Sequence, residues 1–223
     1  MSQAATAPAI SQAAPAYAGG YAQLADELAW LDLLLRLRVG ELRLRAQLSG
    51  QQQIYVAHAE ADALLQPAGG PPDTPDLAEL RAQLAELRAW IEARVAASLE
   101  LGTDLPLARL GRLFGLAPFE LDVLLICLAP ELERKYDRLY AYLQDDITRK
   151  KPSVDLALTL LCDLPAQRWQ ARGAFAAQAP LFRYGLLQAS DDPQSPSGSS
   201  DLARFLKLDP RIAGFLLGDD RID

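Results

Sequence analysis

Residues 181–208 read LFRYGLLQASDDPQSPSGSSDLARFLKL. Two apolar stretches, residues 181–189 and 202–208, lie on either side of the polar eleven-residue loop SDDPQSPSGSS. This arrangement predicts two short strands joined as a β-hairpin, the only convincing β signal in the chain. Asp209 and Pro210 follow as a cap residue and a first-turn proline, so we expect a closing helix that Gly218 stops.

Short helices with clear start and stop residues precede this hairpin. The second of them, FELDVLLICLA, is apolar nearly all round, which predicts a central buried helix. Gly115 stops the first helix, Ser153 caps the fourth, and the fifth includes Trp169. Several small helices followed by a β-hairpin form the outline of a winged helix, here over residues 105–218 with residues 190–201 as the wing. The expected first residues are Pro106, Pro118, Pro130, Val154 and Pro165.

Residues 21–104 predict a helical arm in front of this domain. Apolar residues at helical spacing predict a helix over 21–48, and Thr74 with Pro75 starts a second helix that runs to about residue 101. Between them the sequence PAGGPP at 67–72 is a firm break. The second helix carries a leucine-rich heptad seam of about two heptads, too short for a free-standing coiled coil. We favour an antiparallel hairpin between the two helices over pairing between molecules. The seam residues are Leu77, Leu80, Leu84, Leu87 and Ile91.

Two further features of this half are open to more than one interpretation. Residues 1–20 are rich in Ala, Ser, Gln, Pro and Gly and predict a disordered lead-in. The first helix is apolar over more than one face because Trp30, Leu33, Leu34 and Leu37 widen its stripe. Such excess is typical either of a core helix that packs on two sides, which we favour, or of a protein-binding stripe. Arg36, Arg38, Arg43 and Arg45 fall in its last turns, where they complement the helix dipole.

The composition excludes several classes of protein. The net charge is −7; residues 1–104 hold 13 acids and 7 bases, and residues 105–223 hold 16 and 15, so neither half has the basic surface of a nucleic-acid binder. The N-terminus lacks the features of a secretory signal, and the longest uncharged apolar stretch, residues 123–130, is too short to span a membrane. Cys127 and Cys162 lie in apolar helical text and are expected to be buried free thiols. We therefore expect a cytoplasmic protein.

The sequence offers no catalytic, cofactor-binding or metal-binding residue. A phosphate loop requires a Gly-Lys pair, and none occurs in the chain, so we expect no nucleotide hydrolysis by this polypeptide. The single histidine, His58, has no serine or cysteine elbow near it, and we expect a surface or packing role. One histidine and two cysteines 35 residues apart cannot supply four zinc ligands.

Two sets of charged residues were weighed as sites. Adjacent carboxylates could act as acid and base, but each pair lies at a predicted helix end or loop, where acids are solvated. The bases could contact DNA, but the predicted wing carries Asp191, Asp192 and Asp201 and no base, which disfavours DNA binding. The carboxylate pairs are Asp145–Asp146, Asp191–Asp192 and Asp219–Asp220, and the bases are Arg134, Lys135, Arg138, Arg149, Lys150 and Lys151.

Two stretches of the chain resemble a known family. These are residues 107–161, with the run APELERKYDRLYAYLQDD, and residues 205–223, FLKLDPRIAGFLLGDDRID. Both are similar to the N-terminal region of bacterial AAA+ ATPases in which a winged-helix domain precedes the motor, and whose members occur in gene clusters for extracellular contractile injection systems. The similarity covers residues 105–223. Residues 20–101 are compatible with the family but much less diagnostic.

The resemblance implies a role for this chain through its parent family. In that family LLGDDRID leads to a linker and an ATPase domain, so residues 219–223 are expected to begin a linker to a motor that this chain lacks. ATP, Mg²⁺ and hexamer formation are implied for the parent family alone, and no residue here is assigned to them. The expected function is a non-catalytic recruitment domain that binds a protein partner, either an injection-particle component or the cognate ATPase ring. The alternatives are a winged-helix DNA-binding regulator and a helical scaffold that oligomerises through the heptad helix.

Overall fold

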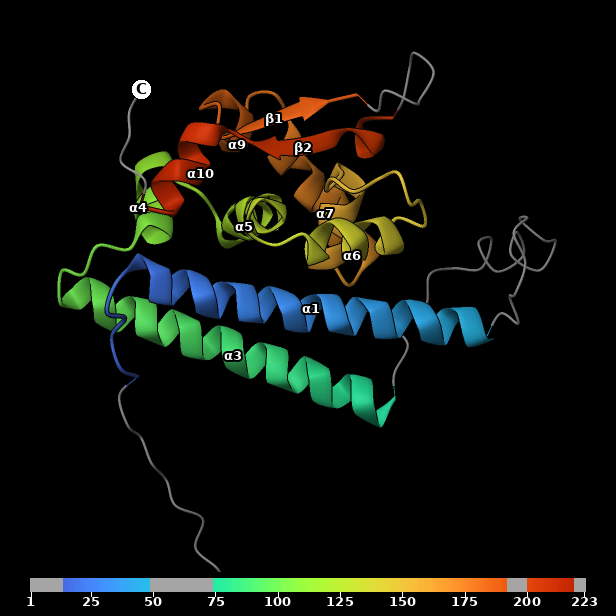
Figure 1. Ribbon diagram of the computed structural model, residues 1–223, viewed down its shortest axis with the longest axis horizontal. Coiled ribbons are helices and arrows are strands. Elements are labelled where there is room, and N and C mark those ends of the chain that lie inside the picture. The colour runs from blue at the N-terminus through green and yellow to red at the C-terminus, as the bar shows by residue number, and fades with distance from the viewer. Residues whose placement is uncertain (1–13, 49–73, 192–199, 219–223) are drawn as a thin grey trace, which may run out of the picture.

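The computed structural model describes residues 14–48, 74–191 and 200–218. In it a pair of long antiparallel helices lies along one side of a cluster of short helices, and a two-stranded sheet lies on the opposite side of that cluster (Figure 1). The elements, in chain order, are α1 (Gly20–Leu48), α3 (Pro75–Glu100), α4 (Pro106–Phe114), α5 (Pro118–Leu132), α6 (Lys135–Leu143), α7 (Val154–Leu161), α8 (Pro165–Ala171), η1 (Arg172–Phe175), α9 (Pro180–Arg183), β1 (Leu187–Ser190), η2 (Asp201–Ala203), β2 (Phe205–Leu208) and α10 (Pro210–Leu216).

The predicted antiparallel hairpin of long helices is confirmed. Thr74 caps α3 by accepting a hydrogen bond from the backbone N–H of Leu77, and Pro75 occupies the first turn. The two helices approach closely at Gly40, where a Cβ would lie 2.8 Å from Leu77 Cδ2. Of the heptad seam, Leu77 and Ile91 are buried, and Leu84 and Leu87 pack against the core. The seam is therefore used within the chain.

Helix α1 is a core helix that packs on two sides. Trp30, Leu34 and Leu37 are all less than a tenth exposed, which confirms the core interpretation of this apolar stripe. One face of α1 packs on α3, and the other packs on α5, α6, α7 and α4. A single hydrophobic cluster consequently includes residues of both the predicted arm and the predicted winged-helix region. The division of the chain at residue 104 stays a prediction.

The N-terminal strap differs from the sequence prediction. Tyr17, which falls in the expected disordered lead-in, is 2% exposed. Its backbone N–H donates to Ser98 Oγ at 2.7 Å, its hydroxyl donates to Asp26, and the Arg94 guanidinium lies 3.9 Å from its ring centroid. Burial of this ring stabilises the N-terminal residues on the helix pair. The lead-in prediction is therefore wrong for residues 14–20, and residues 1–13 lie outside the described part of the chain.

The predicted central helix is α5, and its seven residues from Val123 to Ala129 are all buried. We expected Pro130 to begin a new helix, but α5 continues through it to Leu132. Proline has no N–H to donate to the carbonyl four residues earlier, which is that of Ile126. The hydroxyl of Tyr140, on α6, donates to this carbonyl at 2.9 Å instead. A tertiary contact thus satisfies the group that would otherwise favour ending the helix.

The β-hairpin is confirmed, but its strands are shorter than predicted. β1 pairs antiparallel with β2 from Leu187 opposite Leu208 to Ser190 opposite Phe205. Residues 181–183 belong instead to the turn of helix α9, and Gly185 adopts a left-handed φ of 63° that ends it. The side chain of Ser200 caps η2, so Leu202 and Ala203 are also helical. The mainly helical fold with a small C-terminal hairpin is as expected.

Candidate interaction surface

Helices α7 and α8 form a helix-turn-helix unit joined by residues 162–164. Ser153 caps α7 by accepting a hydrogen bond from the backbone N–H of Leu156. Gln167 Oε1 accepts the N–H groups of Asp163 and Leu164, both at 3.0 Å, and so fixes the turn that begins α8. Ser153 also bridges to Phe205 of β2, so the hairpin follows directly on this unit in space. In a winged helix the second helix of such a unit is the one that meets the partner.

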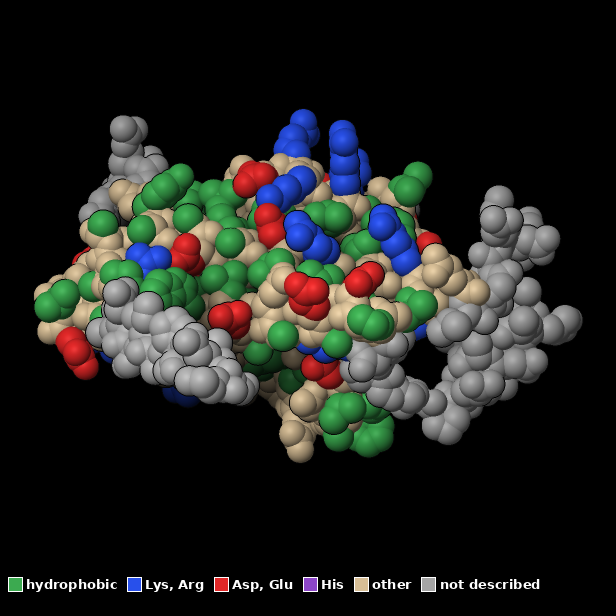
Figure 2. Space-filling view, turned by 90° about the horizontal axis from the view of Figure 1, so that it is seen from below, with side chains coloured by type: hydrophobic (Ala, Val, Ile, Leu, Met, Phe, Trp, Pro, Cys, Tyr) green, Lys and Arg blue, Asp and Glu red, His purple; other side chains and the backbone are tan. Residues whose placement is uncertain are grey.

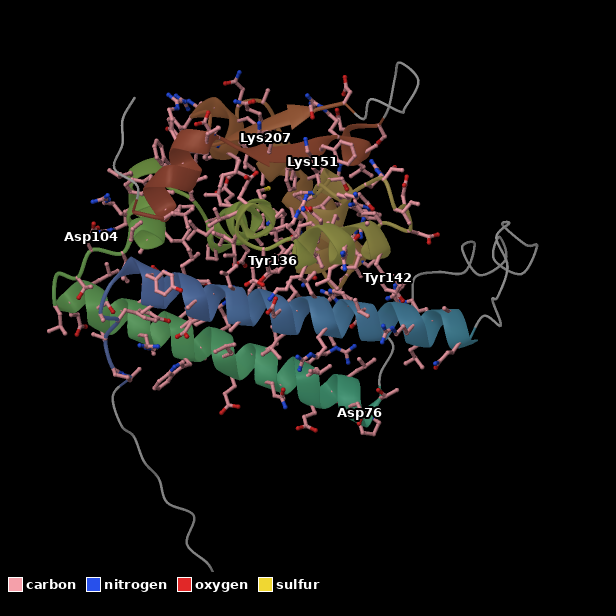
Figure 3. The ribbon with its side chains drawn as sticks, in the orientation of Figure 1. Asp76, Asp104, Tyr136, Tyr142, Lys151 and Lys207 are labelled. Atoms are coloured by element: carbon pink, nitrogen blue, oxygen red, sulfur yellow. The ribbon has the colours of Figure 1, made fainter. Side chains whose placement is uncertain are left out.

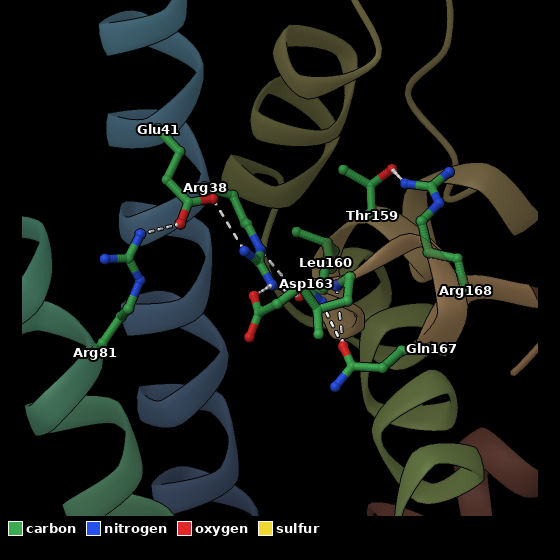
Figure 4. A network of polar contacts seen from close by, with 9 residues as sticks. Arg38, Glu41, Arg81, Thr159, Leu160, Asp163, Gln167 and Arg168 are labelled. Carbon is green, nitrogen blue, oxygen red and sulfur yellow. Dashed lines mark hydrogen bonds and ion pairs between the residues drawn. The ribbon is translucent and has the colours of Figure 1, made fainter. Parts of the chain in front are cut away.

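A buried polar network holds this unit against the long helices (Figure 4). The Arg38 guanidinium, 8% exposed, donates to the Leu160 carbonyl at the end of α7 at 3.1 and 2.8 Å, and pairs with Asp163 at 2.7 Å. It also pairs with Glu41 at 2.9 Å, and Glu41 pairs with Arg81 of α3 at 2.7 Å. The chain of contacts runs from α3 through α1 to the turn before α8. Charged groups buried in this way stay favourable only while each has its partners.

The outward face of α8 presents Pro165, Trp169 and Arg172, which follow one another at helical spacing and are all exposed. We call these three residues the α8 face. Trp169 is 75% exposed, although burial of its indole would be favourable. The base inside the helix, Arg168, points elsewhere, because it donates to Thr159 at 2.8 Å and pairs with Asp155 at 2.6 Å. Tryptophan and arginine are the residues that dominate protein–protein contact energies.

Two grooves lie beside the helix-turn-helix unit. One, of about 590 Å³, runs along α8 and η1, and the other, of about 470 Å³, runs between α3 and α5. They share Phe119 and Leu161, so they form one continuous hollow. Acidic, basic and hydrophobic side chains lie close together on the side of the molecule formed by α1 and α3, with no area of a single charge sign (Figure 2).

The groove beside α3 contains an arginine that joins three helices. Arg88 pairs with Glu27 of α1 at 2.9 Å and with Asp122 of α5 at 2.8 Å, and its guanidinium lies 3.8 Å from the Trp30 ring centroid. Burial raises the pKa of Asp122 to about 7, although the charge of Arg88 opposes this. Burial also raises the pKa of Glu27. No ligand-like group is needed to explain this cluster, since each charge has a partner.

The structure places the residues weighed from sequence as follows. Cys127 and Cys162 are buried free thiols, as predicted, and burial raises the pKa of both. Asp145 is exposed, and hydrogen bonds from Thr148 lower the pKa of Asp146 in a surface turn. His58, Asp192 and the pair Asp219–Asp220 lie outside the described residues.

The predicted bases do not form one patch. Lys135 pairs with Asp32 at 2.7 Å and with Glu133, beside the exposed Arg134 and Arg138. Arg149 donates to the Ala203 carbonyl at 2.7 Å, whereas Lys150 and Lys151 are exposed. Among the described residues, no group of three or more acids, histidines or cysteines could hold a metal ion.

Sequence reasoning missed the residues that hold this surface in place. Arg38 was assigned to the helix dipole, but its contacts with Leu160 and Asp163 are more than 120 residues distant in the chain. Arg88 and Asp122 were not singled out. The α8 face was missed because the 162–164 segment was not recognised as the turn of a helix-turn-helix; the Pro165 start, three residues after α7, was the available signal.

Comparison with known proteins gives a family. A family model described as "Winged helix domain, variant" matches residues 6–223, nearly the whole chain. The chain belongs to this winged helix family. The match spans α1 and α3 as well as the hairpin, so the long helices lie within the region that the winged helix model describes. No curated protein and no solved structure matches the chain. In the described residues of this winged helix protein, no helix is long and apolar enough to cross a membrane.

Proposed function

We propose that this winged helix protein is a non-catalytic module that binds a protein partner through the α8 face and recruits it to an AAA+ ATPase serving a contractile injection system. The observation that carries the binding role is Trp169, which stands exposed on the second helix of the helix-turn-helix unit. Winged helix domains are typically non-catalytic, and the sequence has no phosphate loop, which is compatible with a binding role. The link to the ATPase and to injection particles is supported by the resemblance of residues 107–161 and 205–223.

The two rival functions fit the geometry less well. A DNA-binding helix contacts phosphates and bases with free basic side chains, but Arg168 is paired with Asp155, and Asp191 and Asp201 are exposed beside the hairpin. A scaffold that oligomerises through the heptad seam needs that seam to be free. Leu77 and Ile91 are instead buried within the chain.

The proposal is tested by the binding of purified tube, sheath and baseplate proteins of a contractile injection particle to the immobilised full chain, measured by biolayer interferometry. We expect one of them to bind, and Trp169→Ala to weaken that binding about 30-fold, the effect of losing a 2 kcal/mol hot spot. Trp90→Ala is the matched control, since Trp90 is 42% exposed on α3, away from α8.

Three results would overturn the proposal. Binding that Trp169→Ala leaves unchanged would remove the α8 face. Failure of every particle protein to bind would remove the injection-system role. Retention on a duplex DNA that falls steeply between about 50 and about 200 mM salt would support the DNA-binding alternative instead.

A further inference from the structure

The outer face of the β-hairpin carries two opposed lysines. In β1 and β2, Gln188 lies opposite Lys207. On the other side of β2, the bridge between Ser153 and Phe205 is flanked by hydrogen bonds from Leu206 N–H to the Pro152 carbonyl and from Val154 N–H to the Arg204 carbonyl, at 2.8 and 3.1 Å. The pairing ends there because proline has no N–H to continue it. Continuing this antiparallel register by one residue places Lys151 opposite Lys207.

Both lysines are exposed, and neither is neutralised by the part of the chain that the structure describes. No described acid forms an ion pair with Lys151 or Lys207. The nearest acid along β2 is Asp209, and both of its carboxylate oxygens are already engaged by Arg211, at 3.0 and 3.3 Å. Like charges at opposed positions of a sheet are destabilising. This is unfavourable for the isolated protein.

The face that carries these lysines is open. Leu206 and Leu208 of β2 are buried on the α5 side, whereas Lys207 is exposed on the other side. In the view of Figure 3, Lys151 and Lys207 both lie at the sheet, on the side of the molecule away from α1 and α3. None of the described helices covers them there (Figure 1). An anionic ligand reaching this face would remove the repulsion between the two ammonium groups.

We infer that the sheet face around Lys151 and Lys207 is a docking site for an acidic peptide segment of the protein partner. The site deepens the proposed function by giving the chemistry of a second contact, and it rests on that function. Charge complementarity selects the occupant. A long polyanion such as DNA would also meet Asp191, 79% exposed, and the exposed Asp201 at the end of the hairpin. A short acidic segment fits between these charges.

The test is fluorescence anisotropy of a fluorescein-labelled peptide of alternating Asp and Ser, titrated with the purified full chain at low salt. We expect saturable binding that weakens roughly tenfold in Lys207→Glu and in Lys151→Glu, because each reverses one contacting charge. The matched control is Arg112→Glu, the same charge reversal on an exposed position of α4, which should bind as the wild type does. Lys207→Gln, with unchanged far-UV circular dichroism, gives an intermediate effect and excludes unfolding as the cause.

The outcomes separate this site from the proposed function. Equal binding of a peptide with Asn in place of Asp, or undiminished binding by Lys207→Glu, would overturn the inference. So would tighter binding of a 20-base-pair duplex than of the peptide, or self-association of the chain that Lys207→Glu abolishes. Trp169→Ala should leave peptide binding unchanged. If Trp169→Ala loses particle binding while Lys207→Glu keeps it, the α8 face stands and the lysine site falls.

Discussion

Replacement of Arg38 by alanine tests whether the buried network of Figure 4 holds the helix-turn-helix unit in place. The guanidinium is 8% exposed and the Glu41 carboxylate 5% exposed, so removal of the arginine leaves an acid with one partner fewer away from water. It also removes both side-chain donors to the Leu160 carbonyl. Breaking a buried pair in this way costs about 3–5 kcal/mol of unfolding free energy. For a chain of this size that corresponds to a fall in Tm of roughly 6–20 °C.

Urea denaturation followed by far-UV circular dichroism measures this cost, provided that the m-value is unchanged. Lys135→Ala is the control, because Lys135 is 42% exposed and its ion pairs should contribute less than about 1 kcal/mol. Since Arg38 and Glu41 contact each other, Arg38→Ala combined with Glu41→Ala should cost clearly less than the sum of the two single changes. A loss below about 1 kcal/mol in Arg38→Ala, or full additivity of the pair, would refute the reasoning.

Three other changes have defined outcomes. The raised pKa of Asp122, about 7, means that the folded state binds this proton more tightly, so stability present at low pH is lost as pH rises through that value. Between about pH 5 and about pH 8, Asp122→Asn should therefore lose about 2 kcal/mol less unfolding free energy than the wild type, by urea denaturation, and equal losses would contradict this. Tyr140→Phe leaves the Ile126 carbonyl without a donor and should cost about 1–3 kcal/mol. In a Pro130→Ala background, where residue 130 regains its N–H, the same change should cost less, and an undiminished cost would sink the explanation of how α5 passes the proline. Ser153→Ala removes the α7 cap and should cost about 1–2 kcal/mol in thermal unfolding; no shift in Tm would contradict the capping role.

Local signals predicted most of the helix boundaries. Thr74–Pro75, Ser153 and Asp209–Pro210 begin helices as expected, because each supplies an acceptor for a free N–H of the first turn. The alternation of residues 181–189 was misread because Pro180 starts a helical turn there, and the apolar residues of one turn and of a strand look alike over so short a stretch.

The contacts that position the site could not be predicted from the sequence alone. Nothing near Pro130 shows that Tyr140 donates to Ile126, and nothing near Arg38 identifies Leu160 as its acceptor. The burial of Tyr17 depends on Ser98 and Arg94, about 80 residues away. Such contacts are set by tertiary packing, which helix propensity and periodicity do not encode.

The most direct test of the α8 face uses 5-fluorotryptophan, since the chain has three tryptophans, Trp30, Trp90 and Trp169. Their ¹⁹F resonances are assigned by single Trp→Phe variants, and the particle protein that binds the chain is then titrated in. The account predicts that the Trp169 resonance shifts or broadens at substoichiometric partner, while Trp30, buried between helices, stays unchanged, and that duplex DNA has no effect. A Trp169 resonance that is indifferent to the partner, or one that responds to DNA instead, would contradict it.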